Sequence, residues 1–239
     1  MIDVVYEDAE LLAVNKPTGL LVHRSAIAAD EKVFLLDQVR KYVGAPVFLA
    51  HRLDRATSGV LLLAKSREIA AGLGHQFMAR TVEKSYLAVV RGWPEPEGTI
   101  DYALPDSRER SPRKSALTRW RTLATTELPI ALGKYPQQRY ALIEIRPETG
   151  RYRQIRKHLH HVSHPIIGDT SHGRGDHNRL WRIQFGVHRL LLHAWRLRLQ
   201  HPVNRATLDL QAAPDTDWQR VLARLGWESA LAAADAACC

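Results

Sequence analysis

The chain has 239 residues, 45% of them hydrophobic, a formal net charge of +9 and two cysteines, which adjoin at the C-terminus. This length and composition describe a globular protein of one large or two small domains and exclude a disulfide-stapled scaffold. The first residues lack the features of a signal peptide and no apolar run has membrane-spanning length, so we expect a cytoplasmic protein. The excess of Lys and Arg favours a polyanionic partner, nucleic acid first.

Short apolar runs and turn residues alternate through the first part of the chain. The expected elements are a hairpin of 2–7 and 11–15, an extended run at 20–23, a helix over 30–42 and a buried strand over 60–64. Ser66 can cap the next helix, whose buried face consists of Ile69, Leu73 and Phe77.

The second part of the chain continues the mixture of strands and helices. We expect a strand over 84–91, an irregular basic loop over 103–118, strands at 119–127 and 139–146, a helix over 151–163, a loop over 169–189, a hairpin of 190–200 and 206–211, and a last helix over 218–225. Hairpins dominate, which predicts a single α+β domain with a mixed, largely antiparallel sheet flanked by helices and loops. This domain spans residues 1–228, and the Ala-rich residues 229–239 are expected to form a disordered tail.

One acidic side chain, Asp54, lies within His51–Gly59, between Arg52 and Arg55 and just before the apolar run 60–64. The two arginines favour its ionised form, which suits a nucleophile or a base and argues against a proton donor. A surface carboxylate in an ordinary salt-bridge network explains this stretch equally well when it is taken alone.

Two further side chains are candidates for chemistry on a nucleic acid. Tyr86 lies on the expected strand 84–91, where an aromatic ring with a hydroxyl can stack on a base and share a proton. Arg156 projects from the expected helix 151–163, whose opposite face, including Ile155, is apolar and fixes the helix to a core. Taken alone, each is equally compatible with a structural tyrosine or a surface arginine.

A histidine-rich run, residues 158–164, has the i, i+4 spacing of metal ligands at His160 and His164. It has no Glu between them and no nearby Cys, and it offers only Asp169 as a third ligand. We therefore expect no metal, and we assign these histidines to helix capping and to a basic surface.

Together these motifs resemble the RluA-type pseudouridine synthases. After an entry segment at Asn15–Gly19, four blocks follow in that family's order: His51–Gly59, Lys84–Tyr86, Thr149–Arg156 and His164–Asp169. The resemblance covers residues 2–227 and implies a pseudouridine synthase-type catalytic domain, an isomerase that acts on RNA with no cofactor. It includes no S4-type RNA-binding domain, so we expect none here.

The resemblance also implies roles for individual side chains. Asp54 matches the catalytic aspartate, Tyr86 packs on the target base and helps in proton transfer, and Arg156 pairs with the catalytic carboxylate. Ile155 lines the uracil pocket, and Arg52 enters the duplex in place of the flipped base. Whether Asp54 attacks C1′, adds to C6 or deprotonates C2′ stays open.

Recognition of the RNA is expected to rest on shape and phosphates, because side chains cannot enter the deep groove of A-form RNA. Arg153 stands where the family usually has His, and we assign it, with Arg151, to RNA contacts. The loop 169–189 is a further candidate, as are four residues of the loop 103–118: Arg108, Arg110, Arg113 and Lys114.

The expected substrate is a structured tRNA. Residues 15–25, His51–Gly59 and Asp169–Arg179 resemble one subgroup of the family. This resemblance implies uridine 65, in the stack of the T-arm on the acceptor stem, as the target. Three alternatives remain: a pseudouridine synthase for ribosomal RNA, a non-catalytic RNA-binding protein, and a metal-dependent hydrolase that uses the histidine run.

Overall fold

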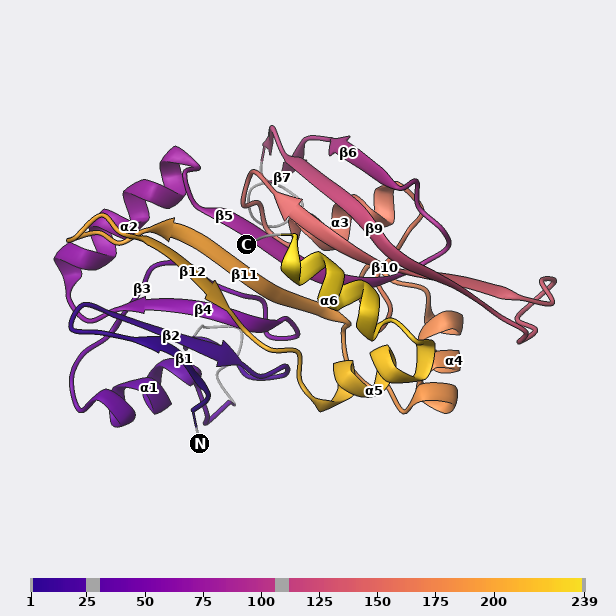
Figure 1. Ribbon diagram of the computed structural model, residues 1–239, viewed down its shortest axis with the longest axis horizontal. Coiled ribbons are helices and arrows are strands. Elements are labelled where there is room, and N and C mark those ends of the chain that lie inside the picture. The colour runs from indigo at the N-terminus through magenta and orange to yellow at the C-terminus, as the bar shows by residue number, and fades with distance from the viewer. Residues whose placement is uncertain (1, 25–30, 106–111, 238–239) are drawn as a thin grey trace. The chain divides into compact units, whose positions relative to one another are not determined.

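The computed structural model describes residues 2–24, 31–105 and 112–237, and the chain divides into two compact units. Unit 1 consists of Met1–Lys84 and His193–Ala213, and unit 2 of Ser85–Leu192 and Pro214–Cys239. Figure 1 shows the helices and strands of both units. No helix in the described part of the chain is both long and apolar enough to cross a membrane.

Unit 1 contains a mixed sheet in the order β1-β2-β4-β11, with β12 beside β11 and β3 beside β4. Its strands are β1 (Val4–Glu7), β2 (Leu11–Lys16), β3 (Phe48–Leu49), β4 (Ser58–Ala64), β11 (Leu192–Gln200) and β12 (Thr207–Gln211). The pair β4/β11 is parallel, with Gly59 opposite Ala194, whereas the other pairs described in this unit are antiparallel.

The core of unit 1 lies between its sheet and helix α2 (Arg67–Ala79). Every residue of β4 is buried, as its apolar run predicted. Leu73 of α2 is buried, and Ile69 and Phe77 pack against the same cluster. The backbone N–H of Ile69 donates to Ser66 Oγ over 3.2 Å, so the expected cap is confirmed. Helix α1 (Leu35–Val43) is shorter than expected, because it begins after Phe34.

Unit 2 contains an antiparallel sheet in the order β5-β10-β9-β6. Its strands are β5 (Glu83–Arg91), β6 (Glu97–Asp101), β9 (Leu117–Leu128) and β10 (Gln138–Pro147), with a separate short hairpin of β7 (Leu104–Pro105) and β8 (Arg113–Lys114). Its helices are α3 (Gln154–His161), α4 (Gly175–Phe185), α5 (Thr216–Leu225) and α6 (Glu228–Ala236). The predicted α+β class with a mixed, largely antiparallel sheet is confirmed.

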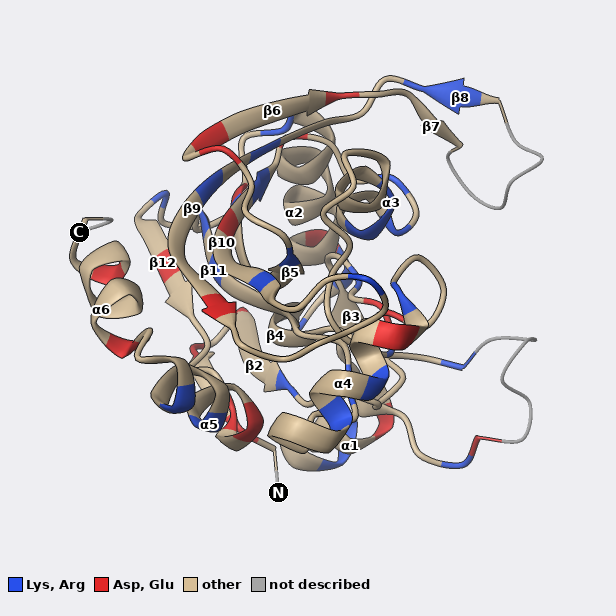
Figure 2. Cartoon of the chain, turned by 90° about the vertical axis from the view of Figure 1, so that its right-hand side faces the viewer, with Lys and Arg blue, Asp and Glu red and all other residues tan. Residues whose placement is uncertain are grey.

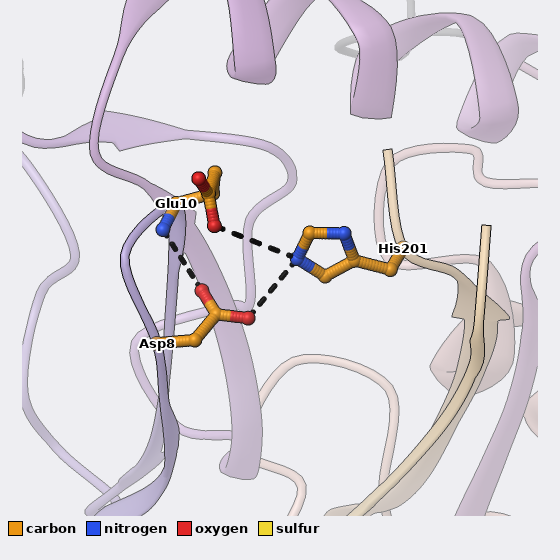
Figure 3. Close-up of side chains that lie close together, drawn as sticks. All are labelled: Asp8, Glu10 and His201. Carbon is orange, nitrogen blue, oxygen red and sulfur yellow. Dashed lines mark hydrogen bonds and ion pairs between the residues drawn. The ribbon is translucent and has the colours of Figure 1, made fainter. Parts of the chain in front are cut away.

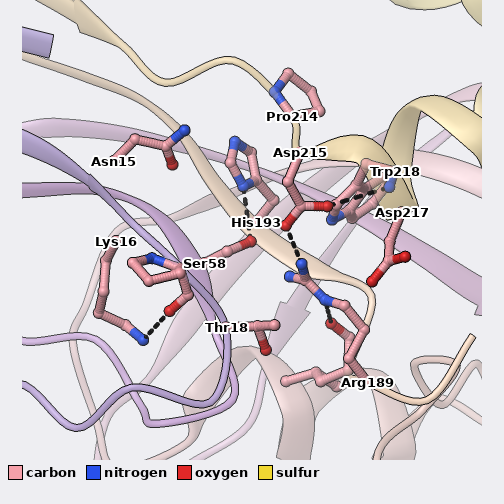
Figure 4. A network of polar contacts seen from close by, with 12 residues as sticks. Asn15, Lys16, Thr18, Ser58, Arg189, His193, Pro214, Asp215, Asp217 and Trp218 are labelled. Carbon is pink, nitrogen blue, oxygen red and sulfur yellow. Dashed lines mark hydrogen bonds and ion pairs between the residues drawn. The ribbon is translucent and has the colours of Figure 1, made fainter. Parts of the chain in front are cut away.

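Helix α5 shows how a polar cap also anchors a neighbouring segment. Asp215 precedes the helix and accepts a hydrogen bond of 3.2 Å from the backbone N–H of Trp218. The same carboxylate forms an ion pair with the buried Arg189 (Figure 4). The start of α5 is thereby tied to the segment that leads into β11.

Two segments expected to be irregular contain regular structure. The loop 169–189 contains α4, whose buried side chains include Leu180, Trp181 and Phe185. Gly, His and Arg are abundant around these apolar residues, so the sequence shows no clear helical period. The basic loop 103–118 contains the β7–β8 hairpin at its ends, and residues 106–111 lie outside the described residues.

The expectation of a disordered tail from residue 229 is wrong for most of that segment. Helix α6 spans Glu228–Ala236, follows the buried Trp227 and buries Ala234. Alanine has the highest helix propensity, so an Ala-rich run can form a helix even where the sequence contains no strong capping or stop residues. Residues 238–239 lie outside the described residues.

The close approach of β4 and β11 generates a prediction about Gly59. This residue has φ +110°, and an added Cβ would lie 2.1 Å from the carbonyl oxygen of Ala194. We expect Gly59→Ala to lower the free energy of unfolding by about 3 kcal/mol or more, since the backbone itself must move. Gly74→Ala is the control: its Cβ meets no atom within 4 Å, and in a helix the change should stabilise by about 0.5–1 kcal/mol. Equal effects in urea unfolding would contradict the prediction.

Candidate active site

Asp54 lies in unit 1, in the loop that leads into β4. Its side chain is half-buried and its carbonyl oxygen accepts from the N–H of Thr57 over 3.1 Å, which closes a turn. Arg52 is exposed. Arg55, unassigned by the sequence, forms an ion pair of 2.5 Å with Glu31 and donates from Nε to the carbonyl of Gly19.

A buried lysine fastens the entry segment to this loop. Lys16 is fully buried, and its Nζ donates to the carbonyl oxygens of Pro17, Leu20 and Arg55 over 2.7, 2.8 and 3.1 Å. Thr18 Oγ1 in turn donates to the carbonyl of Ala56 over 2.8 Å. These bonds satisfy the buried ammonium group and fix the backbone that follows Asp54. The sequence motif suggested an entry segment but not this contact.

Both ends of the Asp54 loop are also anchored. His51 Nε2 accepts from the backbone N–H of Leu62 over 2.9 Å; burial, with repulsion from Lys84, lowers the pKa of His51 to about 4. At the other end, Ser58 Oγ lies 2.8 Å from Nδ1 of the buried His193, whose Nε2 lies 3.0 Å from the carbonyl of Ala212. Because a carbonyl only accepts, Nε2 carries the proton and the serine donates.

Tyr86 and Arg156 lie in unit 2, in β5 and α3. Tyr86 is half-buried and pairs in register with Ile145 of β10. Arg156 is 6% exposed and forms a bidentate ion pair with Asp169: Nε to Oδ2 and Nη2 to Oδ1, both 2.7 Å. The pairing of Arg156 with Asp54 joins residues of different units and stays a prediction.

The ion pair of Asp169 with Arg156 is a contact that the sequence reasoning missed, since Asp169 entered there only at the end of the His164–Asp169 block and as a possible metal ligand. It is 2% exposed. Burial raises the pKa of its carboxyl, but the hydrogen bonds and charge of Arg156 and two backbone N–H donors outweigh burial and hold the pKa below its usual value. The signal available in the sequence was its place at the end of the His164–Asp169 block.

The other predicted residues near α3 lie in its first turn or just before it. Ile155 is buried. Arg151 donates from Nε to the carbonyl of Ser115, and Arg153 donates to Ser171 Oγ over 3.3 Å. Arg153 and Lys157 both place their charges over the ring of Tyr152, 5.0 and 5.3 Å from its centroid. The start of α3 thus carries several cations near one surface.

The basic loop residues are described only in part. Arg113 and Lys114 form β8 and are exposed, and Arg113 donates to the hydroxyl of Tyr102 over 2.9 Å. Figure 2 shows the blue segments of α3 and β8, both within unit 2. Arg108 and Arg110 lie outside the described residues.

Comparison with known proteins decides the family. The profile described as "RNA pseudouridylate synthase" matches residues 10–161. Proteins named tRNA pseudouridine synthase C are similar: that of Pectobacterium carotovorum is 47% identical over 97% of this chain, and that of Vibrio cholerae 45% over 97%. The chain spans 64% of the Pectobacterium protein and 98% of the Vibrio protein. This chain belongs to the RNA pseudouridylate synthase family.

Solved structures agree with this assignment. Human RNA pseudouridylate synthase domain containing 4 aligns with a TM-score of 0.71 at 25% identity, covering 93% of this chain and 92% of that one. Human RNA pseudouridylate synthase domain containing 1 gives 0.70 at 26% identity, covering 90% and 84%. The predicted family and enzyme class, a pseudouridine synthase and therefore an isomerase, are confirmed.

The synthase also has a cluster with the composition of a metal site, Asp8, Glu10 and His201 (Figure 3). His201 Nε2 lies 3.0 Å from Asp8 Oδ2 and 4.0 Å from Glu10 Oε2. His201 Nδ1 accepts from the backbone N–H groups of Val203 and Asn204, so Nε2 carries the proton and donates to Asp8. In this arrangement the cluster forms a polar clamp between two hairpins of unit 1.

Helix α4 of the synthase is docked on the sheet of unit 2 through the buried His177. Its Nδ1 lies 2.9 Å from the hydroxyl of Tyr140, and its Nε2 accepts from Nε of Arg91 over 3.0 Å. Burial, with repulsion from Arg91, lowers the pKa of His177 to about 4. A proton on Nε2 would meet the guanidinium, so the folded protein holds this ring neutral.

This contact predicts a pH dependence of stability. The unfolded chain protonates His177 below about pH 6.5, whereas the folded chain does so only near pH 4. Stability is therefore complete above pH 6.5 and is lost as the pH falls towards 4, by about 2 kcal/mol at pH 5 from this residue. We expect urea unfolding of His177→Gln to lose correspondingly less between pH 7 and pH 5. The matched change His75→Gln, at an exposed position, should leave the wild-type pH dependence intact; an unchanged dependence in both variants would contradict the assignment.

Proposed function

We propose that this synthase isomerises uridine to pseudouridine in a structured tRNA, with uridine 65 as the target. The observation that carries the proposal is the similarity, over nearly the whole chain, to several proteins named tRNA pseudouridine synthase C. The net charge of +9 and the cations of α3 and β8 are consistent with an RNA partner. Ribosomal RNA is the alternative substrate.

The proposed reaction conserves all atoms of the substrate. The N1–C1′ bond of uridine breaks, the base turns, a C5–C1′ bond forms, and the hydrogen on C5 is replaced while N1 gains a proton. Such an exchange needs no oxidant and no external group, so we propose that it proceeds without a cofactor. A uridine within a stem must first leave the stack, which costs a few kcal/mol.

We assign the steps to the residues that the sequence singled out. Asp54 is the catalytic carboxylate, Tyr86 packs on the uracil and shares its proton, and Ile155 adds apolar cover. Arg52, which is exposed, occupies the gap that the flipped base leaves. Arg156 supports the ionised carboxylate, and Asp169 fixes its guanidinium through the two short bonds.

The role of Asp54 can be tested by an isosteric change. Asp54→Asn removes the charge and the nucleophile but keeps the shape, so pseudouridine formation should fall by about a thousand-fold or more while tRNA binding stays close to wild type. Release of tritium from C5-labelled tRNA and a filter-binding assay measure the two quantities. Asp209→Asn, an exposed acid of β12, is the control and should retain activity. An active Asp54→Asn variant would refute the assignment.

The target can be tested by chemical mapping of pseudouridine in total tRNA and ribosomal RNA from cells with and without the gene. Loss of pseudouridine at position 65 of tRNA is the expected result. Loss confined to ribosomal RNA would replace the tRNA substrate with the alternative, and loss of none would remove the enzymatic proposal.

The basic loop should contribute phosphate contacts. Changing Arg108, Arg110, Arg113 and Lys114 to Ala is expected to weaken tRNA binding and to flatten the plot of log K against log salt, by about 0.7–0.9 in slope per lost phosphate contact. A charge-matched control changes four exposed cations of unit 1: Lys32, Arg40, Lys41 and Arg67. If both variants keep the wild-type slope, the loop is not part of the contact surface.

A further inference from the structure

One asparagine of α4, Asn178, holds the backbone on both sides of the peptide that enters Asp169. Its Oδ1 accepts from the backbone N–H of Gly168 over 2.8 Å, and its Nδ2 donates to the carbonyl oxygen of Asp169 over 2.9 Å. An amide side chain that uses both its donor and its acceptor on one short segment fixes that segment in position and in rotation. Both bonds go to the backbone of Gly168 and Asp169, so an effect of Asn178 on the proposed catalytic residues passes through this segment.

The backbone that follows Asp169 folds back and donates hydrogen bonds to the Asp169 carboxylate. Oδ1 of Asp169 accepts from the backbone N–H groups of Ser171 and His172, both over 2.9 Å. Gly173 packs so closely that an added Cβ would lie 2.2 Å from the carbonyl oxygen of Asp169. The carboxylate therefore cannot rotate without breaking bonds to its own loop, and it passes this fixed orientation to Arg156 through two bonds of 2.7 Å.

The helix that carries Asn178 is fixed in turn. The preceding residue, His177, binds Tyr140 of β10 and Arg91 of β5. Trp181, one turn further along α4, is fully buried with its ring edge-on to that of Tyr140. Consecutive residues of α4 thus face the sheet and the Asp169 loop, and the chain of contacts runs from the sheet to the guanidinium.

We infer that Asn178 is a positioning residue for Arg156, which acts through the loop at Asp169 to set the orientation of the guanidinium. The inference rests on the proposed function in one respect: Arg156 must take part in the reaction for the orientation to affect the rate. A displacement of about 1 Å at a reacting group costs roughly a hundred-fold in rate. Loss of the clamp should therefore lower kcat, whereas phosphate contacts, and with them the KM for tRNA, should change little.

The test is a double-mutant cycle on Asn178→Ala and Arg156→Lys. Asn178→Ala should lower kcat by about 10- to 100-fold with KM within about twofold of wild type. Arg156→Lys replaces the planar guanidinium by an ammonium group, which has no plane for the Asp169 loop to orient. The double variant should therefore be no slower than Arg156→Lys alone. Asn178→Ser, which keeps a hydroxyl for one of the two bonds, carries the same test if the alanine variant fails to fold.

Asn204→Ala is the matched control, because Asn204 also bonds a nearby backbone N–H, that of Ala206, but in unit 1. It should leave kcat unchanged. A wild-type kcat for Asn178→Ala, or a loss that adds fully to that of Arg156→Lys, would overturn the inference.

A second measurement needs no activity. The Nε–H of Arg156 should give a slowly exchanging NMR signal in the folded protein, and Asn178→Ala should speed its exchange more than ten-fold while Asn204→Ala does not. If no cellular RNA gains pseudouridine, the proposed function fails, and this exchange rate still decides whether the clamp exists.

Discussion

The buried pair of Arg156 and Asp169 is the interaction on which the arrangement of α3 and α4 depends. Removing two charges from water costs several kcal/mol per ion, and their attraction offsets this only when the other hydrogen-bonding groups are satisfied. The loop after Asp169 supplies two backbone N–H donors, and Asn178 fixes the backbone of that loop. The pair and its surroundings are therefore interdependent: without the loop the pair is costly, and without the pair the loop encloses an unbalanced charge.

Unit 1 contains a buried positive charge whose hydrogen-bond donors must likewise be satisfied. Lys16 is buried among carbonyl oxygens of its own segment and of Arg55. A lysine ammonium has several donors and no fixed plane, so it can gather carbonyls from two separate loops where an arginine fork would demand a flat partner. In unit 1 a buried charge joins two stretches of backbone next to Asp54, and in unit 2 a buried ion pair joins the Arg156 side chain to the loop at Asp169. Backbone partners suit this purpose because their positions are set by the fold and do not depend on a second flexible side chain.

The sequence predicted what depends on short-range pattern. The apolar run of β4, the cap at Ser66 and the hairpins follow from periodicity and turn residues, and the family follows from four ordered blocks. Helix α4 was missed because its polar residues bind the sheet and the Asp169 loop, so its composition resembles that of a loop. Helix α6 was missed because high alanine content carries little amphipathic signal. The partner of Arg156 was missed because an ion pair between a helix and a loop produces no periodic residue pattern that the sequence could show.

The buried and the exposed charges of this synthase depend on their surroundings in different ways. Exposed and half-buried cations such as Arg113, Arg153 and Lys157 interact with any anion that approaches. A shift of an ångström changes their attraction to a phosphate only slightly, because the charge acts over the screening length. Buried charges act over single hydrogen bonds, whose strength falls steeply with angle and distance. Changes on the exposed surface should therefore act gradually and additively, whereas a change in the chain from the sheet through α4 to Arg156 should act abruptly, because each member orients the next through hydrogen bonds.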